Sequence, residues 1–261
     1  MSSTELDRIL TDAQRFLQQE KLLFGNTLYP EPRTRAAEPA PTAVTGPEPM
    51  APKKKPTSAP AVAAAPTTSA AEKWQKDATL DALNRHICEC TKCRLGATRT
   101  KFVFGVGNPN ADVMVIGEAP GADEDKQGEP FVGRAGQLLN KILEAINFKR
   151  EEVYIANILK CRPPENRRPH PDEVEQCEPY LWKQIELIRP KFILALGLTA
   201  AQTLLKTTES LTQLRASVHD YHGVPLYVTY HPAALLRNPE WKRPTWEDVQ
   251  KLRKAYDESK K

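Results

Sequence analysis

Cysteine is scarce in this chain, with five residues among 261, and their number is odd. The first residues, Met1 to Glu5, also lack the charged and then apolar segment of a secretory signal. Both observations argue against the disulfide framework of a small secreted protein, which pairs an even number of cysteines in an oxidising compartment. We therefore expect a cytoplasmic protein whose thiolates stay free to bind a metal.

Long apolar runs and a strong charge excess are absent as well. No segment approaches the roughly 20 apolar residues that span a bilayer, so we expect no contact with a membrane. The formal net charge of +4 permits a nucleic acid as partner, but it falls short of the basic surface of a protein that binds by charge alone. With 40% hydrophobic residues the chain can bury a substantial core, so its partner must be inferred from a site.

Three segments of the chain differ in composition. Residues 1–27 carry apolar side chains at the three-and-four spacing of an amphipathic helix, which either folds back on its own domain or docks on a protein partner. Residues 28–72 contain ten of the 23 prolines and few large apolar groups, which predicts a disordered linker. We expect residues 73–261 to form the globular domain.

In this domain, short β-branched runs alternate with longer stretches of helical spacing. The expected strands are Val113–Ile116, Val153–Ile155, Phe192–Leu196 and Leu226–Val228, and the expected helices are Gly136–Ile146, Pro171–Ile188 and Thr199–Leu205. This alternation predicts an α/β fold with a parallel sheet that is covered by helices on both faces. Ligands of such sheets bind beyond the carboxyl ends of the strands, so residues that follow strands are the first candidates for a site.

Three strand ends carry such candidates. Glu118 stands in the turn Gly117–Gly121, at the rim of the sheet, where a solvated turn glutamate is the alternative. Asn157 offers an amide donor and acceptor together, which suits the edge of a planar base, although asparagine also caps strands. His231 could donate to an oxygen that gains charge as a bond breaks, unless it is a structural histidine.

Two further segments place apolar side chains in expected loops. Phe131 stands between glycines just before a helix, and it either stacks on a flat ligand or anchors the loop to the core. The segment 233–239 carries Leu235, Leu236 and Arg237. The leucines could form a wedge that enters a nucleic-acid duplex beside a cation on phosphate, or they could pack on the following segment.

The cysteines are spaced like metal ligands. Cys90 and Cys93 are separated by two residues, and Cys161 and Cys177 follow after a long structured segment. Cys88 is an alternative ligand, but the two-residue spacing favours Cys90. Four thiolates suit both zinc and an iron–sulfur cluster, and spacing does not separate the two; incidental buried thiols are the third possibility.

With these residues in view, the chain from about Leu83 to Leu252 resembles the family-4 uracil-DNA glycosylases, the iron–sulfur branch of that superfamily. The resemblance rests on the segments 90–93, 117–121, 130–136, 157–164, Cys177 and 231–233. It implies a three-layer α/β/α sandwich around a four-stranded parallel sheet. It also implies a [4Fe-4S] cluster on four cysteines, namely Cys90, Cys93, Cys161 and Cys177.

The resemblance further implies the roles of the site residues. Phe131 would stack on a uracil flipped out of the DNA, Asn157 would read its Watson–Crick edge, and His231 would stabilise the departing uracil anion. Arg237 and the neighbouring Leu235 and Leu236 resemble the part that follows the base out of the duplex.

The carboxylate that acts on the sugar or on water is expected to be Glu118, at the edge of the uracil pocket, with Glu124 as second candidate. In the better-known branch of the superfamily an aspartate follows the residue that corresponds to Glu118, whereas this chain has Ala119, which we expect to lie against the uracil. A related subgroup traps uracil through a histidine in an inserted loop. The segment 162–171 is too short for that insertion, so turnover is expected.

The expected activity is hydrolysis of the N-glycosidic bond of deoxyuridine in single- or double-stranded DNA, which releases uracil, leaves an abasic site and initiates base excision repair. We expect a monomer associated with the nucleoid. The alternative is a non-catalytic iron–sulfur module that binds nucleic acid or senses redox state, and Ala119 is the one feature that favours it.

Overall fold

The computed structural model describes residues 14, 18 and 73–261. Apart from residues 14 and 18, the expected N-terminal helix (1–27) and linker (28–72) lie outside the described residues, so both stay predictions. The fold below is that of residues 73–261.

A six-stranded mixed sheet forms the centre of the fold, in the order β1-β3-β2-β4-β6-β5. The strands are β1 (Val106–Gly107), β2 (Val113–Gly117), β3 (Tyr154–Asn157), β4 (Phe192–Leu196), β5 (His219–Tyr221) and β6 (Val224–Thr229). The four inner strands pair in parallel, as predicted. The predicted strand count of four is wrong, because β1 and β5 add one antiparallel strand at each edge. Both edge strands are too short for an alternating pattern to reveal them.

Helices cover both faces of the sheet and confirm the predicted three layers. Alternate residues of a strand face opposite sides, so Met114 and Ile116 of β2 belong to one core and Val113 and Val115 to the other. The first core is completed by side chains of α2 (Leu80–Ile87), α5 (Pro171–Ile188), α6 (Leu198–Leu205) and α7 (Leu211–Arg215). The second is completed by α4 (Arg134–Ala145), α8 (Pro232–Arg237) and α9 (Lys242–Glu258).

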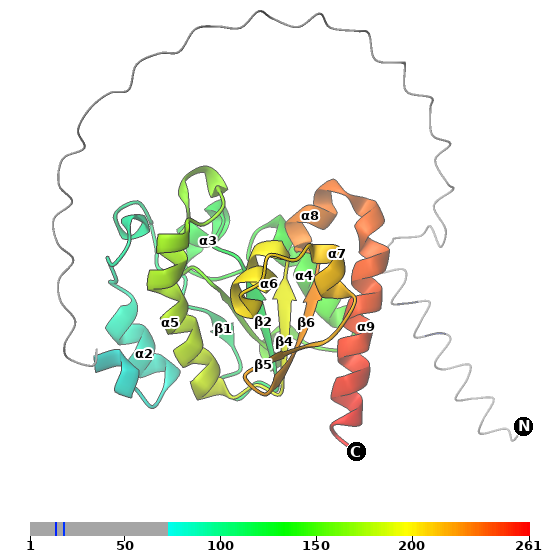
Figure 1. The fold of residues 1–261 in the computed structure, drawn as a ribbon. Coiled ribbons are helices and arrows are strands. Elements are labelled where there is room, and N and C mark those ends of the chain that lie inside the picture. Colours follow the sequence, from blue (N-terminus) through cyan, green and yellow to red (C-terminus); the bar gives the residue numbers. More distant parts are fainter. Residues whose placement is uncertain (1–13, 15–17, 19–72) are drawn as a thin grey trace, which may run out of the picture. The chain divides into compact units, whose positions relative to one another are not determined.

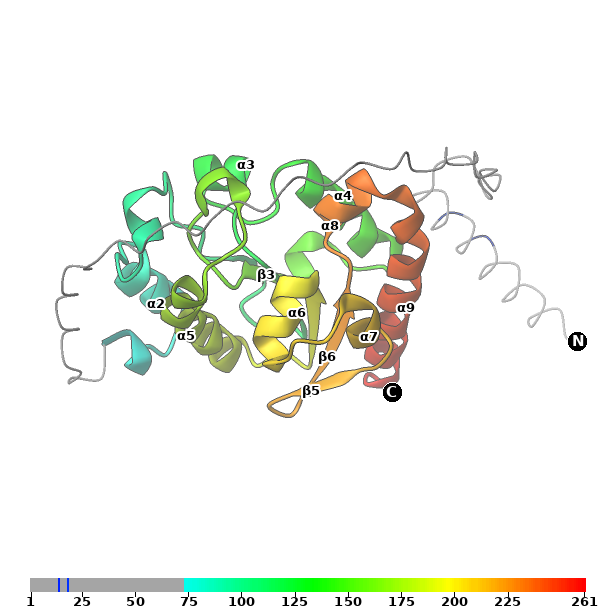
Figure 2. The ribbon, with the colours of Figure 1, turned by 45° about the horizontal axis from the view of Figure 1, so that its top comes forward.

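The remaining helical segments are short. They are η1 (Lys73–Lys76), η2 (Arg94–Ala97), α3 (Ala122–Gln127), η3 (Arg150–Glu152), η4 (Pro164–Asn166) and η5 (Pro239–Trp241). Figure 1 and Figure 2 both show α3 and α8 at the end of the sheet toward which the parallel strands point. Among the described residues, no helix combines the length and the apolar character that a bilayer span requires.

The predicted helix Pro171–Ile188 is confirmed at both ends as α5. Proline occupies its first position, where no backbone donor is needed, and the carboxylate of Glu173 accepts from the backbone N–H of His170 at 2.8 Å. The helix ends at Arg189, whose φ of 53° is left-handed. This helix matters for the site because it carries Cys177.

One expected loop is a helix. Residues Pro232–Arg237 form α8, with His231 as N-cap residue, so the expected solvent-facing loop at 233–239 is wrong. Leu235 is only 1% exposed and belongs to the core beside α4, whereas Leu236 is 40% exposed. Of the two leucines expected to form a wedge, only Leu236 is therefore at the surface, because successive residues of a helix point in different directions.

Candidate active site

The ends of three parallel strands bring the predicted site residues to one edge of the sheet. Gly117 ends β2 and is paired in register with Asn157, which ends β3. Beyond β6, His231 follows Thr229 after one residue, and the backbone oxygen of Thr229 accepts from the N–H of Gly197 at 2.8 Å. A Cβ on Gly197 would lie 3.0 Å from the Cβ of His231, so β4 and the His231 segment are in close contact.

The amide of Asn157 is buried, with 2% of the residue exposed, and its Oδ1 has no hydrogen-bond partner among the described residues. The Oδ1 faces Gly117, where an added Cβ would lie only 2.4 Å away. The same Cβ would lie 2.7 Å from Cζ of Phe131. Because Gly117 has no side chain, the amide of Asn157 and the ring of Phe131 share one space. An unpaired buried amide is costly, so it marks a place where a ligand can supply the partner.

Phe131 is held in a tight turn before α4. Its φ is 55°, a left-handed conformation that a bulky residue rarely adopts, and its ring is buried. A Cβ on Gly136, in the first turn of α4, would lie 1.8 Å from the backbone oxygen of Phe131. The turn therefore rests directly on the backbone of α4. The rings of Phe131 and His231 lie beside each other, with centroids 5.5 Å apart and planes tilted by 32°.

Glu124 ties this turn to the segment after β2. Its Oε1 accepts from the backbone N–H groups of Val132 and Gly133, both at 3.0 Å, and its Oε2 accepts from that of Gly121 at 3.1 Å. Three donors thus engage the carboxylate. The sequence predicted Glu124 as a second candidate for the catalytic carboxylate and did not indicate these hydrogen bonds. They depend on contacts between two turns that are separate in the sequence.

His231 is electrically neutral at pH 7. Burial lowers its pKa to about 4, and the positive charge of Arg237 acts in the same direction. Its Nδ1 lies 3.2 Å from the backbone N–H of Ala233, which can only donate. The neutral ring therefore carries its proton on Nε2.

Glu118 lies at the rim of the same edge. Its backbone oxygen accepts from the N–H of Leu159 at 3.1 Å, which holds the segment after β2 against the segment after β3. In the described part of the chain its carboxylate makes no hydrogen bond or ion pair. Ala119 is half-buried and packs against the core on the α5 side of the sheet. Arg237 is exposed at the end of α8.

The cysteines gather on the α5 side of the sheet and are all free thiols. Three of them accept hydrogen bonds from different residues: Cys90 Sγ from Tyr180 at 3.2 Å, Cys161 Sγ from Arg99 at 3.4 Å, and Cys177 Sγ from the backbone of Lys160 at 3.3 Å. Electrostatic interactions connect Cys161 with Cys90 and Cys93, and Cys177 with Cys161 and Cys93.

Burial dominates the acidity of the two inner thiols. It raises the pKa of Cys177 to about 12, against the smaller lowering effect of Lys160, and it also raises the pKa of Cys161. Cys88 is turned to its own helix, where its Sγ lies 3.6 Å from the backbone oxygen of Arg85. Among the described residues, no group of three or more His, Cys, Asp or Glu side chains is arranged to hold a single metal ion.

Sequence reasoning gave no role to Lys160, which is completely buried beside Asn157 and Cys161. Its Nζ donates to the backbone oxygen of Asn157 at 2.8 Å and to Oε1 of Gln184 at 2.6 Å. The signal was a lysine at the end of an apolar run, Ile158-Leu159-Lys160. Burial lowers the pKa of Lys160 to about 8, while Cys177 and Cys161 act to raise it.

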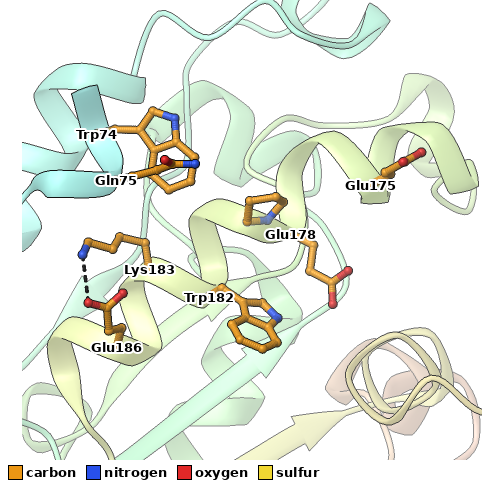
Figure 3. A pocket seen from close by; sticks show the side chains of 8 residues that line it. Trp74, Gln75, Glu175, Glu178, Trp182, Lys183 and Glu186 are labelled. Carbon is orange, nitrogen blue, oxygen red and sulfur yellow. Dashed lines mark hydrogen bonds and ion pairs between the residues drawn. The ribbon is translucent and has the colours of Figure 1, made fainter. Parts of the chain in front are cut away.

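A separate pocket lies between η1 and α5, with a volume of about 390 Å³. Its lining residues are Trp74, Gln75, Glu175, Glu178, Pro179, Trp182, Lys183 and Glu186 (Figure 3). None of the predicted site residues lines it, and its rim carries an ion pair of 3.0 Å between Lys183 and Glu186. The chemistry at the strand ends therefore does not depend on this pocket.

Comparison with known proteins gives matches over most of the described region. The sequence profile of the Uracil DNA glycosylase superfamily matches residues 104–252. The chain is 44% identical over 182 residues to the type-4 uracil-DNA glycosylase of Archaeoglobus fulgidus, a match that covers 67% of this chain and 92% of that protein. It is 40% identical to the type-4 uracil-DNA glycosylase of Thermotoga maritima, over 69% of this chain and 96% of that protein.

A more distant relative is the type-5 uracil-DNA glycosylase of Pyrobaculum aerophilum, with 34% identity over 49% of this chain and 64% of that protein. Identity and coverage are thus higher for the two type-4 proteins. The matched region includes all three strand ends of the site, as well as Phe131 and His231. The chain belongs to the uracil DNA glycosylase superfamily and to its type-4 branch.

Proposed function

We propose that this protein is a monofunctional uracil-DNA glycosylase, which hydrolyses the N-glycosidic bond of deoxyuridine in DNA and leaves an abasic site. The observation that carries the proposal is the unpaired, buried Oδ1 of Asn157 in the space that it shares with Phe131, beside a neutral His231. Membership of the type-4 branch supports the same activity.

Recognition of uracil follows from the amide of Asn157. The glycosidic carbon is inaccessible inside a duplex, so the nucleotide must be extruded into the site. There the Oδ1 accepts from N3–H of uracil and the Nδ2 donates to O4. Cytosine offers the reverse pattern, an acceptor at N3 and a donor at N4, and is rejected because the buried amide would stay unpaired. Phe131 stacks on the face of the base.

His231 stabilises the leaving group. When the bond between C1′ and N1 breaks, its electron pair departs with uracil and negative charge spreads to O2. The Nε2–H of the neutral imidazole donates to that oxygen, and burial makes this bond stronger than it would be in water. The N-terminal N–H of α8 keeps Nδ1 occupied, so the donating tautomer is already in place before substrate binds.

Glu118 carries the charge that faces the sugar. Its carboxylate has no partner in the described part of the chain, so it is available to stabilise positive charge on the sugar and to orient the water whose oxygen bonds to C1′. Glu124 serves differently, because three backbone donors hold its carboxylate. We assign to Glu124 the positioning of the Phe131 turn rather than the activation of water.

The cysteine centre fits an iron–sulfur cluster. Cys90, Cys93, Cys161 and Cys177 would hold a [4Fe-4S] cluster, because three of their sulfurs accept hydrogen bonds, as cluster ligands commonly do. A cluster gives each thiolate its own iron, so it does not require the close convergence that a single ion needs. When bound, the cluster cross-links the segment before β2 to α5. Because burial raises the pKa of Cys177, this thiol would have to lose its proton to become a ligand of the cluster.

The DNA-facing end of α8 offers Leu236 and Arg237, both exposed, beyond the neutral His231. Arg237 is suited to a phosphate of the strand, and Leu236 to the gap that the extruded nucleotide leaves. Leu235 takes no part in this contact, because it packs in the core.

The proposal is tested by uracil release from an oligonucleotide with a single uracil, with Asn157→Ala and His231→Ala compared to wild type. We expect a loss of about 100-fold for Asn157→Ala, since the base loses its paired amide. For His231→Ala we expect a loss of about 100- to 1000-fold, the cost of removing one donor to a developing anion. His222→Ala is the matched control, because His222 lies in the β5–β6 turn at the opposite end of the sheet and should leave the rate unchanged.

The visible absorption of the cluster is recorded for all four proteins, so that a lost cluster is not mistaken for a lost catalytic group. A coloured wild-type protein that binds DNA but releases no uracil would contradict the proposal. That result would favour the non-catalytic iron–sulfur module, with Ala119 as the reason for inactivity.

A further inference from the structure

Lys160 is a completely buried lysine between the cysteines and the uracil-reading residue. It follows Asn157 by three positions and directly precedes Cys161, and none of its surface is exposed. An ammonium group at such a place loses its hydration, so its burial must be offset by acceptors and by negative charge nearby. The structure supplies the acceptors, and the ligands of the proposed cluster would supply the charge.

The acceptors come from β3 and α5. The Nζ of Lys160 donates to the backbone oxygen of Asn157 at 2.8 Å and to Oε1 of Gln184 at 2.6 Å. Gln184 is itself fixed, because its Nε2 donates to the backbone oxygen of Phe104 at 2.9 Å and lies 3.3 Å from the hydroxyl of Tyr154. The ammonium therefore joins the end of the uracil-reading strand to the helix that carries Cys177.

The negative charge would come from the cysteines as thiolates of the proposed cluster, because burial keeps the free thiols protonated. No carboxylate forms an ion pair with Lys160 in the described part of the chain, and the ionisable groups that interact with it electrostatically are Cys177 and Cys161. In addition, the backbone N–H of Lys160 donates to Cys177 Sγ at 3.3 Å. The same residue thus contacts a ligand of the proposed cluster and the backbone of Asn157.

We propose that Lys160 is a positioning residue that couples the cysteine centre to uracil recognition: its ammonium fixes the backbone of Asn157 and balances the charge of the thiolates. The inference rests on the proposed function and adds to it a link between the cluster and the base. A buried positive charge beside a cluster favours the reduced form, which is the more negative one. Loss of the ammonium should therefore change both uracil binding and the reduction potential of the cluster.

The experiment compares Lys160→Met with Lys183→Met in the full-length protein with its cluster. Methionine keeps the length of the side chain and removes the ammonium. Lys183 is the matched control, because it is a nearly buried lysine of α5 whose partner is Glu186 and not a site residue. Four kinds of measurement are made: iron content, affinity for free uracil, reduction potential by protein-film voltammetry, and the kinetics of uracil release as kcat and KM.

For Lys160→Met we expect full iron content, about tenfold weaker uracil binding and a more negative reduction potential; the weaker binding corresponds to the loss of one hydrogen bond from a charged donor. Lys183→Met should match wild type in all of these measurements. A Lys160→Met protein that matches Lys183→Met in uracil affinity and in potential would overturn the proposal. A merely structural lysine would lower stability without moving the potential.

Gln184→Met keeps the test decisive if Lys160→Met loses its cluster or does not fold. It leaves the ammonium and its bond to Asn157 in place and removes one acceptor, so we expect the same changes at a smaller size. Suppose that Lys160→Met does not take up a cluster and that Gln184→Met has the uracil affinity and the reduction potential of wild type. Lys160 would then have a folding role only, and the proposed coupling would be overturned. If the wild-type protein neither binds nor releases uracil, the proposed function and the coupling are both overturned. If the wild-type protein releases uracil and Lys160→Met has the same uracil affinity and reduction potential as wild type, only the coupling is overturned.

Discussion

Gly117 and Gly136 meet Phe131 at two contacts where a side chain would not fit. A Cβ on Gly117 would enter the space between the Phe131 ring and the Asn157 amide, and a Cβ on Gly136 would collide with the Phe131 backbone. The absence of a side chain at Gly117 and Gly136 thus determines the shape of the proposed base pocket, together with Phe131 and Asn157. Alanine at either position would displace the ring rather than shift a flexible tip, because the contacts are with backbone or with the aromatic ring itself.

The low pKa of His231 gives a prediction for the pH dependence. The NMR titration of its ring, assigned by comparison with His231→Gln, should have a midpoint near 4 and should report the Nε2–H tautomer at pH 7. The unfolded chain takes up this proton near the ordinary value of about 6.5. Between these two values the unfolded state binds more protons, so the free energy of unfolding falls as the pH decreases through this window.

The His231→Gln variant lacks this contribution, and its free energy of unfolding should depend less on pH from about 6.5 down to 4, measured by urea denaturation. Uracil release by wild type should show no titration near pH 6.5 that belongs to this histidine. A midpoint near 6.5 in the NMR titration would mean that the imidazole is not held neutral by burial.

The positions of three residues of the proposed site could be predicted from the sequence because they follow from local rules. Asn157 and His231 stand at strand ends, and Phe131 stands between glycines at a helix start, where parallel sheets place their ligands. Glu124 and Lys160 could not be assigned in the same way. Their roles depend on which backbone groups a second segment brings within 3 Å or so, and hydropathy and spacing contain no information on that distance.

At the scale of elements, the short helix α8 gives the segment 232–237 a structure that differs from the loop predicted from the sequence. Its six residues begin with Pro232 and are too few for a helical period to be recognised, so the segment reads as a loop. In the structure the helix turns Leu235 into the core and caps itself with the Nδ1 of His231. The inner strands β2 and β4 could be predicted, by contrast, because each is a short apolar run buried on both faces.

The turn that Glu124 holds gives a second prediction. Glu124→Gln keeps one acceptor oxygen, so kcat/KM of uracil release should fall about tenfold, and Glu124→Ala should lose about 100-fold because three backbone donors lose their partner. The shape of the pH–rate profile should stay the same in Glu124→Gln, since a positioning carboxylate neither gives nor takes a proton in the reaction.

Glu129→Gln is the control, because Glu129 is exposed on the segment that leads into the same turn. Two results together would show that Glu124 is the base that activates water. The acid limb of the pH–rate profile would disappear in Glu124→Gln, and kcat/KM would fall as far in Glu124→Gln as in Glu124→Ala.

At the scale of the whole molecule, η1 (Lys73–Lys76) links the start of the segment 73–261 to the cysteine centre. Trp74 is buried and meets Tyr180 of α5 in an edge-on contact, with ring centroids 4.9 Å apart. Tyr180 in turn donates to Cys90. The first described segment therefore belongs to the support of the cysteine centre, whereas the proposed reaction uses no residue before it.

Removal of residues 1–72 should leave uracil release from a short oligonucleotide within about twofold of wild type, because every residue of the proposed site lies beyond this boundary. Removal of residues 1–78 also deletes Trp74, and should lower the free energy of unfolding by about 3 kcal/mol, as is usual for the loss of a buried tryptophan. Urea denaturation and the excision assay are measured on both truncations. If the protein that lacks residues 1–72 kept its cluster but released no uracil, residues 1–72 would have a catalytic or DNA-binding role.

The four cysteines of the proposed centre have a particular order along the chain. Cys90 and Cys93 precede β2, Cys161 follows β3, and Cys177 lies in α5, before β4. His231 is added only after β6. During synthesis from the N-terminus, all four cysteines therefore leave the ribosome before His231 does. The proposed ligands of the cluster are therefore all synthesised before the proposed reaction could take place, so assembly of the cysteine centre does not have to wait for the last part of the sheet.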